Sequence, residues 1–193
     1  MFGLIIGALE VAAFVVTVVS AAVSICRNLG ILKPDTEPED LGDRALQAKE
    51  AGINPEDYDG RFEEYRDKIE NFEIDPEKSK NYTPEQKLAA AGEVTGWALT
   101  EYYGKESGVD KFIECEWNKN EGYYEPARAA AYMEEFKGGG MDKIGDYFDN
   151  KLDSLQGIKQ IEGKLQEAEK SLGVSEDEAK ERLQVEVERR AEA

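Results

Sequence analysis

Glu10 is the strongest candidate for a functional side chain, because it lies in an apolar segment and is the only charged side chain before Arg27. An ionised carboxylate in such surroundings costs several kcal/mol unless it is neutralised, paired or hydrated. We favour a protonated Glu10 that hydrogen-bonds to Thr17 or to a carbonyl of a neighbouring helix and so fixes an assembly. The other interpretations are an ion or proton relay, a pair with a basic residue of a partner, and snorkelling toward an interface.

The small and polar residues of this segment fall on one line of an expected helix, which we call the predicted seam. Alternating steps of four and three residues connect Gly3, Gly7, Glu10, Phe14, Thr17, Ala21 and Ser24. Helices in lipid associate by close backbone approach and by hydrogen bonds between helices, and a Gly-xxx-Gly pattern favours close approach. The predicted seam is therefore a candidate surface for self-association.

The hydrophobicity of residues 2–26 predicts a membrane helix. A helix of this length spans roughly 37 Å, which is enough to cross a hydrocarbon core of about 30 Å. No basic residue precedes the run, whereas Arg27 and Lys33 follow it. This bias favours a single-pass arrangement in a lipid bilayer with the large C-terminal domain in the cytoplasm. A cleaved signal peptide and a core helix of a soluble assembly are the alternatives.

The remainder of the chain is strongly acidic. Of the 193 residues of the whole chain, 42 are Asp or Glu, 24 are Lys or Arg and none is His, which gives a net charge of −18, and Glu10 is the only charged side chain before Arg27. Such a chain lacks the basic field that neutralises phosphates, so no nucleic-acid partner is expected. Without histidine there is no Ser-His-Asp triad, no Cys-His pair and no imidazole metal ligand. We therefore expect no catalytic residue, no cofactor and no metal site.

One acidic segment has the look of a calcium loop, with Asp57 and Asp59 preceding Gly60. If Gly60 took the sixth position of such a loop, Pro55 would occupy the first position and Arg66 the twelfth, where acidic ligands are needed. The match fails. Most of the other acids alternate with lysines along helix faces, which is typical of a solvated surface.

Capping signals predict a series of helices after the linker 33–40. Thr36 and Glu39 have the spacing of a capping box for a helix that ends at Gly52. Asn54 followed by proline then opens a helix that runs to about residue 72. An aromatic and aliphatic stripe at helical spacing predicts its core face: Tyr58, Phe62, Tyr65, Ile69 and Phe72.

The same device of a capping residue before proline recurs further along the chain. Asp75 precedes one proline, and Thr83 precedes another with Gln86 three residues later. The second of these opens a long helix over 84–103, whose alanines and glycines allow close approach by neighbouring helices. Residues 107–117 are ambiguous: 112–117 alternate like a strand but have no partner strand, so we expect a helix there too.

The C-terminal part is predicted to form a helical hairpin. Gly138, Gly139 and Gly140 form the strongest break in the chain and indicate a hinge or a tight helix connection. A helical pattern over 141–172 follows, and Ser175 with Glu178 caps a last helix. The pair could extend as a coiled-coil arm, but its regular heptads are too few, so packing on the bundle is preferred.

These patterns together predict an all-α protein with five parts. They are an N-terminal hydrophobic helix that is transmembrane or serves in assembly (1–32), a linker (33–40), an acidic multi-helix bundle (41–137), a glycine hinge (138–140) and a helical hairpin (141–193). The favoured function is a non-enzymatic structural or assembly subunit that self-associates through the predicted seam, as a homo-oligomer or in a multi-subunit membrane complex. The alternative is a single-pass accessory subunit of a larger membrane complex in which Glu10 pairs with a partner or an ion pathway.

Overall fold

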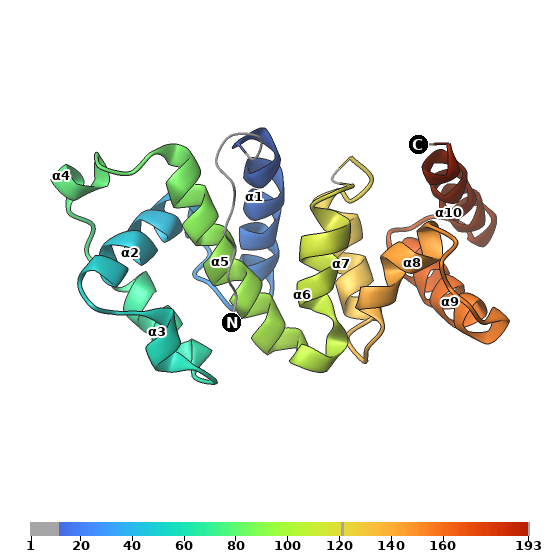
Figure 1. Cartoon of the computed structure of the whole chain (residues 1–193), viewed down its shortest axis with the longest axis horizontal. Coiled ribbons are helices and arrows are strands. Elements are labelled where there is room, and N and C mark those ends of the chain that lie inside the picture. The colour runs from blue at the N-terminus through green and yellow to red at the C-terminus, as the bar shows by residue number, and fades with distance from the viewer. Residues whose placement is uncertain (1–11, 121, 193) are drawn as a thin grey trace. The chain divides into compact units, whose positions relative to one another are not determined.

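A computed structural model describes residues 12–120 and 122–192 of the chain. All regular secondary structure in these ranges is helical, with no strand, which confirms the all-α prediction. The chain divides into two compact units, Met1–Glu101 (unit 1) and Tyr102–Ala193 (unit 2). Figure 1 shows the helices of both units, coloured from the N-terminus to the C-terminus. The division lies near the end of the long helix predicted over 84–103, whereas the sequence suggested a break at 138–140.

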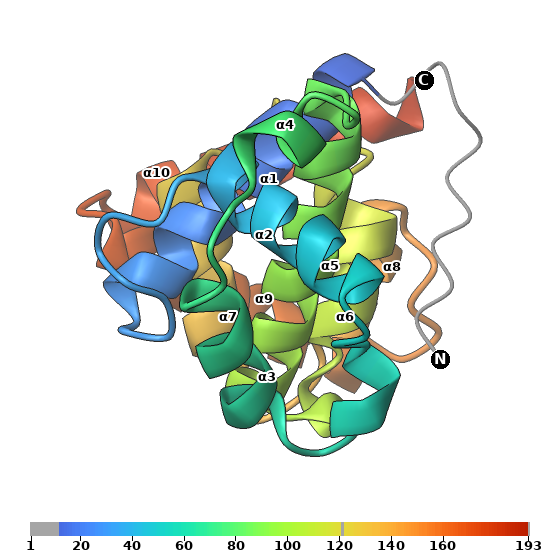
Figure 2. The same ribbon diagram turned by 90° about the vertical axis from the view of Figure 1, so that its left-hand side faces the viewer.

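Unit 1 contains helices of very different lengths. Its elements are α1 (Ala12–Asn28), α2 (Pro38–Glu50), η1 (Pro55–Tyr58), α3 (Phe62–Glu70), α4 (Pro76–Ser79) and α5 (Pro84–Tyr103), the last of which ends just inside unit 2. α2 contacts α1, α3 and α4. Figure 2 faces this unit and shows α2 lying against α5.

The aliphatic side chains of α1 are part of a protein core. The buried side chains on this helix are Val18, Val19, Ala21, Ala22, Val23, Ile25 and Cys26. A side chain built on Gly92 of α5 would lie 3.1 Å from the Cγ2 methyl of Val19, so α1 and α5 pack closely. The sequence had assigned these aliphatic residues to lipid because a uniformly apolar run fits a membrane and a protein interior equally well. Within the described residues, no helix combines the length and the apolar composition that crossing a bilayer requires.

The predicted core stripe of unit 1 is confirmed at its centre. Phe62, Tyr65 and Ile69 are buried on one face of α3, at the expected helical spacing. The rings of Phe62 and Tyr65 contact that of Trp97 on α5, with centroids 5.1 and 5.2 Å apart. The continuous helix predicted from Asn54 is wrong, because Gly60 adopts a φ of 69° and separates η1 from α3.

Three of the predicted caps form as expected. Thr83 and Gln86 bond reciprocally, side chain to backbone N–H, and Asp75 accepts from the first two N–H groups of α4 that follow its proline. Ser175 accepts from the backbone N–H of Glu178. The capping box predicted at Thr36 is wrong: Pro38 sets the start of α2, so the cap position falls one residue later, at a side chain that makes no capping bond.

Unit 2 is built from shorter elements than the sequence suggested. They are η2 (Lys105–Ser107), α6 (Val109–Lys111), η3 (Phe112–Trp117), α7 (Pro126–Glu135), η4 (Met141–Lys143), α8 (Ile144–Phe148), α9 (Leu155–Ser171) and α10 (Glu176–Ala191). The single helix predicted over 141–172 is wrong. Asn150 takes a left-handed φ of 54°, and Ser154 caps a new helix through the N–H of Gly157.

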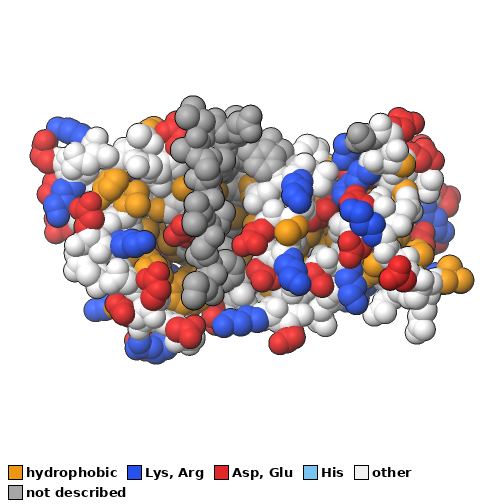
Figure 3. All heavy atoms as spheres, viewed as in Figure 1, with side chains coloured by type: hydrophobic (Ala, Val, Ile, Leu, Met, Phe, Trp, Pro, Cys, Tyr) orange, Lys and Arg blue, Asp and Glu red, His pale blue; other side chains and the backbone are white. Residues whose placement is uncertain are grey.

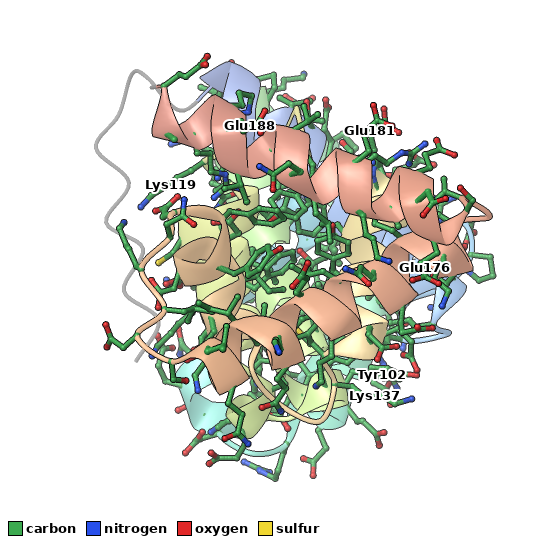
Figure 4. The ribbon with its side chains drawn as sticks, turned by 90° about the vertical axis from the view of Figure 1, so that its right-hand side faces the viewer. Tyr102, Lys119, Lys137, Glu176, Glu181 and Glu188 are labelled. Carbon is green, nitrogen blue, oxygen red and sulfur yellow. The ribbon has the colours of Figure 1, made fainter. Side chains whose placement is uncertain are left out.

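The last two helices form the expected hairpin on the body of unit 2. α9 packs on α7, and α10 packs on both α9 and α8. Figure 4 looks onto α9 and α10, with aromatic side chains filling the space beneath them. The fully buried aromatic side chains of unit 2 include Trp117, Tyr124, Tyr132 and Phe148. Residues 112–117, which alternate like a strand, form a π-helix, as the lack of a partner strand predicted.

Candidate functional site

Only part of the predicted seam lies within the described residues. Gly3, Gly7 and Glu10 fall outside them, and Phe14 is placed in α1 by its backbone alone. Of the remaining seam residues, Thr17 is exposed, Ala21 is buried and Ser24 is half-buried. The predicted seam therefore lies at the edge of the exposed face of α1, and one of its residues, Ala21, is in the core.

The exposed face of α1 carries mostly small polar side chains, which we call the α1 stripe. Thr17, Ser20 and Asn28 are exposed, and Ser24 lies half-buried between them. Val16, next to the start of this stripe, is 41% exposed. The sequence pattern had left Ser20 off the seam, although it lies on the same free face as Thr17. The α1 stripe thus shares Thr17 and Ser24 with the predicted seam, adds Ser20 and Asn28, and lacks the buried Ala21.

The triple glycine is a tight connection between α7 and η4. Gly139 and Gly140 have φ values of 114° and 97°, which non-glycine residues rarely adopt. Lys164 of α9 donates to the carbonyl oxygen of Gly139 at 3.2 Å, and its ammonium lies 4.9 Å from the ring centroid of Phe136. The turn is therefore tied to α9, and the predicted hinge motion at Gly138–Gly140 remains a prediction.

Glu169, a carboxylate that sequence reasoning missed, is completely buried in unit 2. Its Oε1 accepts from Arg128 Nε at 2.7 Å and from the Tyr132 hydroxyl at 2.9 Å. Its Oε2 lies 3.3 Å from Arg182 Nη1 of α10. Two guanidinium groups and one phenol thus satisfy a charge that would otherwise be very unfavourable in the interior.

Glu116 of η3 is a second buried carboxylate, and it binds the end of α10. Its Oε1 accepts from the Tyr124 hydroxyl at 2.7 Å, and both oxygens accept from the guanidinium of Arg190. Arg190 also stacks on Phe148, with Cζ 4.7 Å from the ring centroid. A Cβ on Gly145 would lie 2.6 Å from Glu116 Oε2, so a larger residue at this position would displace the carboxylate of the ion pair.

Glu186 of α10 completes this network. Its Oε1 accepts from Arg190 Nε at 2.6 Å and from Arg189 Nη2 at 2.7 Å. Burial alone would raise the pKa of Glu186, but the hydrogen bonds from the two arginines outweigh burial and lower this pKa below its ordinary value of 4.5. Arg190 therefore joins two buried carboxylates, one from its own helix and one from η3.

A chain of phenols runs beside these charges. The hydroxyls of Tyr123 and Tyr132 lie 2.9 Å apart, and Tyr132 donates to Glu169. Burial is the main cause that raises the pKa values of Tyr123, Tyr124 and Tyr132 above 10, and nearby carboxylates add to it. These phenols therefore stay protonated at neutral pH and act as hydrogen-bond donors in the core.

Unit 1 contains one buried polar cluster of its own. Asp43 of α2 accepts from Lys87 Nζ at 2.8 Å and from Gln47 Nε2 at 2.7 Å, and Ser79 donates its hydroxyl to the same carboxylate. The lysine also donates to the Ser79 hydroxyl at 2.8 Å. A serine beside a lysine can act as a nucleophile with a neutral amine as base. Here Lys87 is engaged in an ion pair with Asp43, and the cluster ties α4 to α2 and α5.

A small cavity of about 150 Å³ lies beside the start of α2. Lys33, Glu37, Arg44 and Glu70 line it together with four other residues, so both signs of charge face it. Within the described ranges, no group of three or more acidic or cysteine side chains is arranged to hold a metal ion. The arrangement does not select one class of ligand.

The chain matches no protein-family model, no curated protein and no solved structure in three separate comparisons. The functional argument therefore depends on the geometry of its own residues. The most unusual features of that geometry are the α1 stripe and the buried ion pairs that fasten α10.

Proposed function

We propose that this protein is a structural subunit that self-associates through the free face of its N-terminal helix and displays an acidic helical domain. The observation that carries the proposal is the α1 stripe. The aliphatic side of α1 is used in the core, whereas Thr17 and Ser20 stay exposed on the other side beside a partly exposed Val16. A second copy of the chain is the occupant we propose for this face.

Small side chains favour this kind of contact because they let two helix backbones approach closely. The heptad spacing continues from Thr17 back through Phe14, Glu10, Gly7 and Gly3 in the sequence. In the proposed assembly, the two glycines extend the close contact and Glu10 hydrogen-bonds across it. Replacing Glu10 with Gln should then leave the assembly largely intact, since an amide can still make such a bond.

The charge of the chain predicts how this association responds to salt. Figure 3 shows Lys and Arg side chains interspersed with Asp and Glu on one face of the molecule, but the acids are in excess and the net charge is −18. Copies of the chain therefore repel one another over a distance of about 10 Å at moderate ionic strength. Added salt should strengthen the assembly by screening this repulsion.

Mass measurement of the full-length protein, with and without mild detergent, tests the proposal. The wild type should form an oligomer that dissociates when Gly3 and Gly7 are both replaced by Ile, or when Ser20 is replaced by Lys. Gly163→Ile is the matched control, because Gly163 is exposed on α9 and no atom lies within 4 Å of its built Cβ. This control should keep the oligomer.

Two outcomes would contradict the proposal. One is a monomer at all protein concentrations in both solvents. The other is flotation of the full-length protein with lipid vesicles as a monomer, which would support the bilayer placement of the N-terminal segment without self-association.

A further inference from the structure

The C-terminal helix α10 contacts the rest of unit 2 through a few buried side chains and through charged groups. Only Ala179, Leu183 and Glu186 of this helix are fully buried. In addition, two arginines of α10 contact carboxylates that are buried on other elements. Arg182 contacts Glu169 of α9, and Arg190 contacts Glu116 of η3. Figure 4 shows α10 lying across unit 2, with Glu181 on its outer side.

The surface beneath α10 matches this helix in charge and shape. Glu116 and Glu169 are 7% and 0% exposed at their side chains, and Phe148 offers its ring to the guanidinium of Arg190. Removing α10 would leave Glu116 without its only guanidinium partner among the described residues. A buried carboxylate without its partner is strongly unfavourable, so this surface requires an arginine-bearing helix.

The connection that precedes α10 is short and depends on one glycine. α9 ends at Ser171, α10 begins at Glu176, and Gly173 between them has a φ of 88°. In this left-handed conformation the backbone reverses direction. If Gly173 adopted ordinary helical angles instead, α9 and α10 would extend away from each other, and α10 would lose its contacts with α8, α9 and η3.

We infer that the surface beneath α10 binds α10 of a second copy, so that two copies exchange their C-terminal helices. An identical helix restores every ion pair that opening breaks, including Arg190 with Glu116 and Arg182 with Glu169. Exchange of an identical element is a low-cost route to a closed, two-fold dimer. The contact lies in unit 2 and does not depend on the α1 stripe.

A pair of charge-reversed full-length variants tests this exchange. Glu116→Arg opposes Arg190 within each copy, and Arg190→Glu opposes Glu116 in the same way. In an exchanged dimer of one copy of each variant, both sites regain one arginine and one glutamate. The two variants, labelled with different isotopes and refolded together, should therefore give heterodimers in excess of the statistical fraction in native mass spectrometry.

The matched control reverses an ion pair that exchange cannot restore. Glu176 and Lys180 form a 2.6 Å pair within α10 itself, so they move together. Glu176→Lys mixed with Lys180→Glu should give only the statistical fraction, and association through the α1 stripe would give that same fraction in both mixtures. If the Glu116 and Arg190 variants also give only the statistical fraction, the inference is wrong.

A variant of the turn keeps the test decisive if the charge-reversed chains do not fold. Gly173→Ala should raise the dimer fraction, with helix content retained, because alanine disfavours the closed turn. Gly52→Ala is its control, since Gly52 has the same φ of 88° after α2 in unit 1. A dimer fraction for Gly173→Ala no higher than that for Gly52→Ala would overturn the inference.

Discussion

Gly42 of α2 lies directly against the backbone carbonyl of Lys87 on α5, and a Cβ at Gly42 would overlap that oxygen. No side-chain rotation can relieve the overlap, because the obstacle is main chain. This contact brings the two helices together and places Asp43 within 2.8 Å of Lys87 Nζ. The glycine therefore sets the position of the buried polar cluster of unit 1.

Gly42→Ala should destabilise the protein strongly. Overpacking a core usually costs about 1–3 kcal/mol, and we expect about 3 kcal/mol or more here because helix backbones must separate. The free energy of unfolding, measured by urea denaturation with circular dichroism, gives the comparison with wild type.

Gly96→Ala on α5 is the control for this substitution. No atom lies within 4 Å of its built Cβ, so the alanine meets open space. It should stabilise the helix by about 0.5–1 kcal/mol. A Gly42→Ala protein as stable as wild type would contradict the described approach of α2 to α5.

Glu169→Gln should destabilise unit 2 because it removes the only negative charge that Arg128 contacts among the described residues. Breaking a buried ion pair by removing one partner costs about 3–5 kcal/mol. Glu167→Gln is the control, since Glu167 pairs with Lys170 on the exposed side of the same helix. Its urea midpoint should equal that of wild type. Equal midpoints for both variants would mean that Glu169 is hydrated rather than buried.

Local features of the fold could be predicted from the sequence, and distant pairings could not. The reciprocal cap of Thr83 and Gln86 spans three residues, so its spacing alone identifies it. The stripe through Phe62 and Ile69 follows from helical periodicity in the same way. In contrast, Arg190 and Glu116 are 74 positions apart, and nothing in the residues around either one indicates the partner.

The environment of the N-terminal helix also could not be predicted from the sequence. Val18, Val23 and Ile25 satisfy the hydropathy of a membrane segment, yet the same side chains are suited to a core of helices. The deciding information is the presence of a flat partner surface on α5, where Gly92 admits Val19. Such complementarity between distant helices appears only when they are folded together.

The reactivity of the two cysteine thiols tests whether α1 is buried. Cys115 is exposed, whereas Cys26 is buried, and burial raises the pKa of the Cys26 thiol to about 12. A thiol reacts through its thiolate, so Cys26 should be inert in the native protein. A colorimetric thiol reagent should titrate one group per chain rapidly and the second only in denaturant. Cys115→Ser should abolish the rapid reaction, and rapid labelling of Cys26 would contradict the core position of α1.

The carboxylates around Arg190 predict a loss of stability in acid. Burial raises the pKa of Asp149, but hydrogen bonds from Lys151 and Arg190 outweigh it, so this pKa lies below its ordinary value of 3.8, as that of Glu186 lies below 4.5. The unfolded chain therefore takes up protons before the folded one does. The contribution of Asp149 and Glu186 to the stability of the fold is fully present at a pH above their ordinary pKa values. It is lost as the pH falls through their lower pKa values in the folded state.

Urea midpoints measured from about pH 7 to about pH 3 should fall for the wild type, and Glu186→Gln should change this profile in two ways. The variant should be less stable at neutral pH, because Arg189 and Arg190 lose a charged partner. It should also lose less stability in acid, because one of the carboxylates with a lowered pKa is gone. Glu181→Gln, on the exposed side of α10, should keep the wild-type profile. Parallel profiles for wild type and Glu186→Gln would show that Glu186 does not contribute to the acid transition.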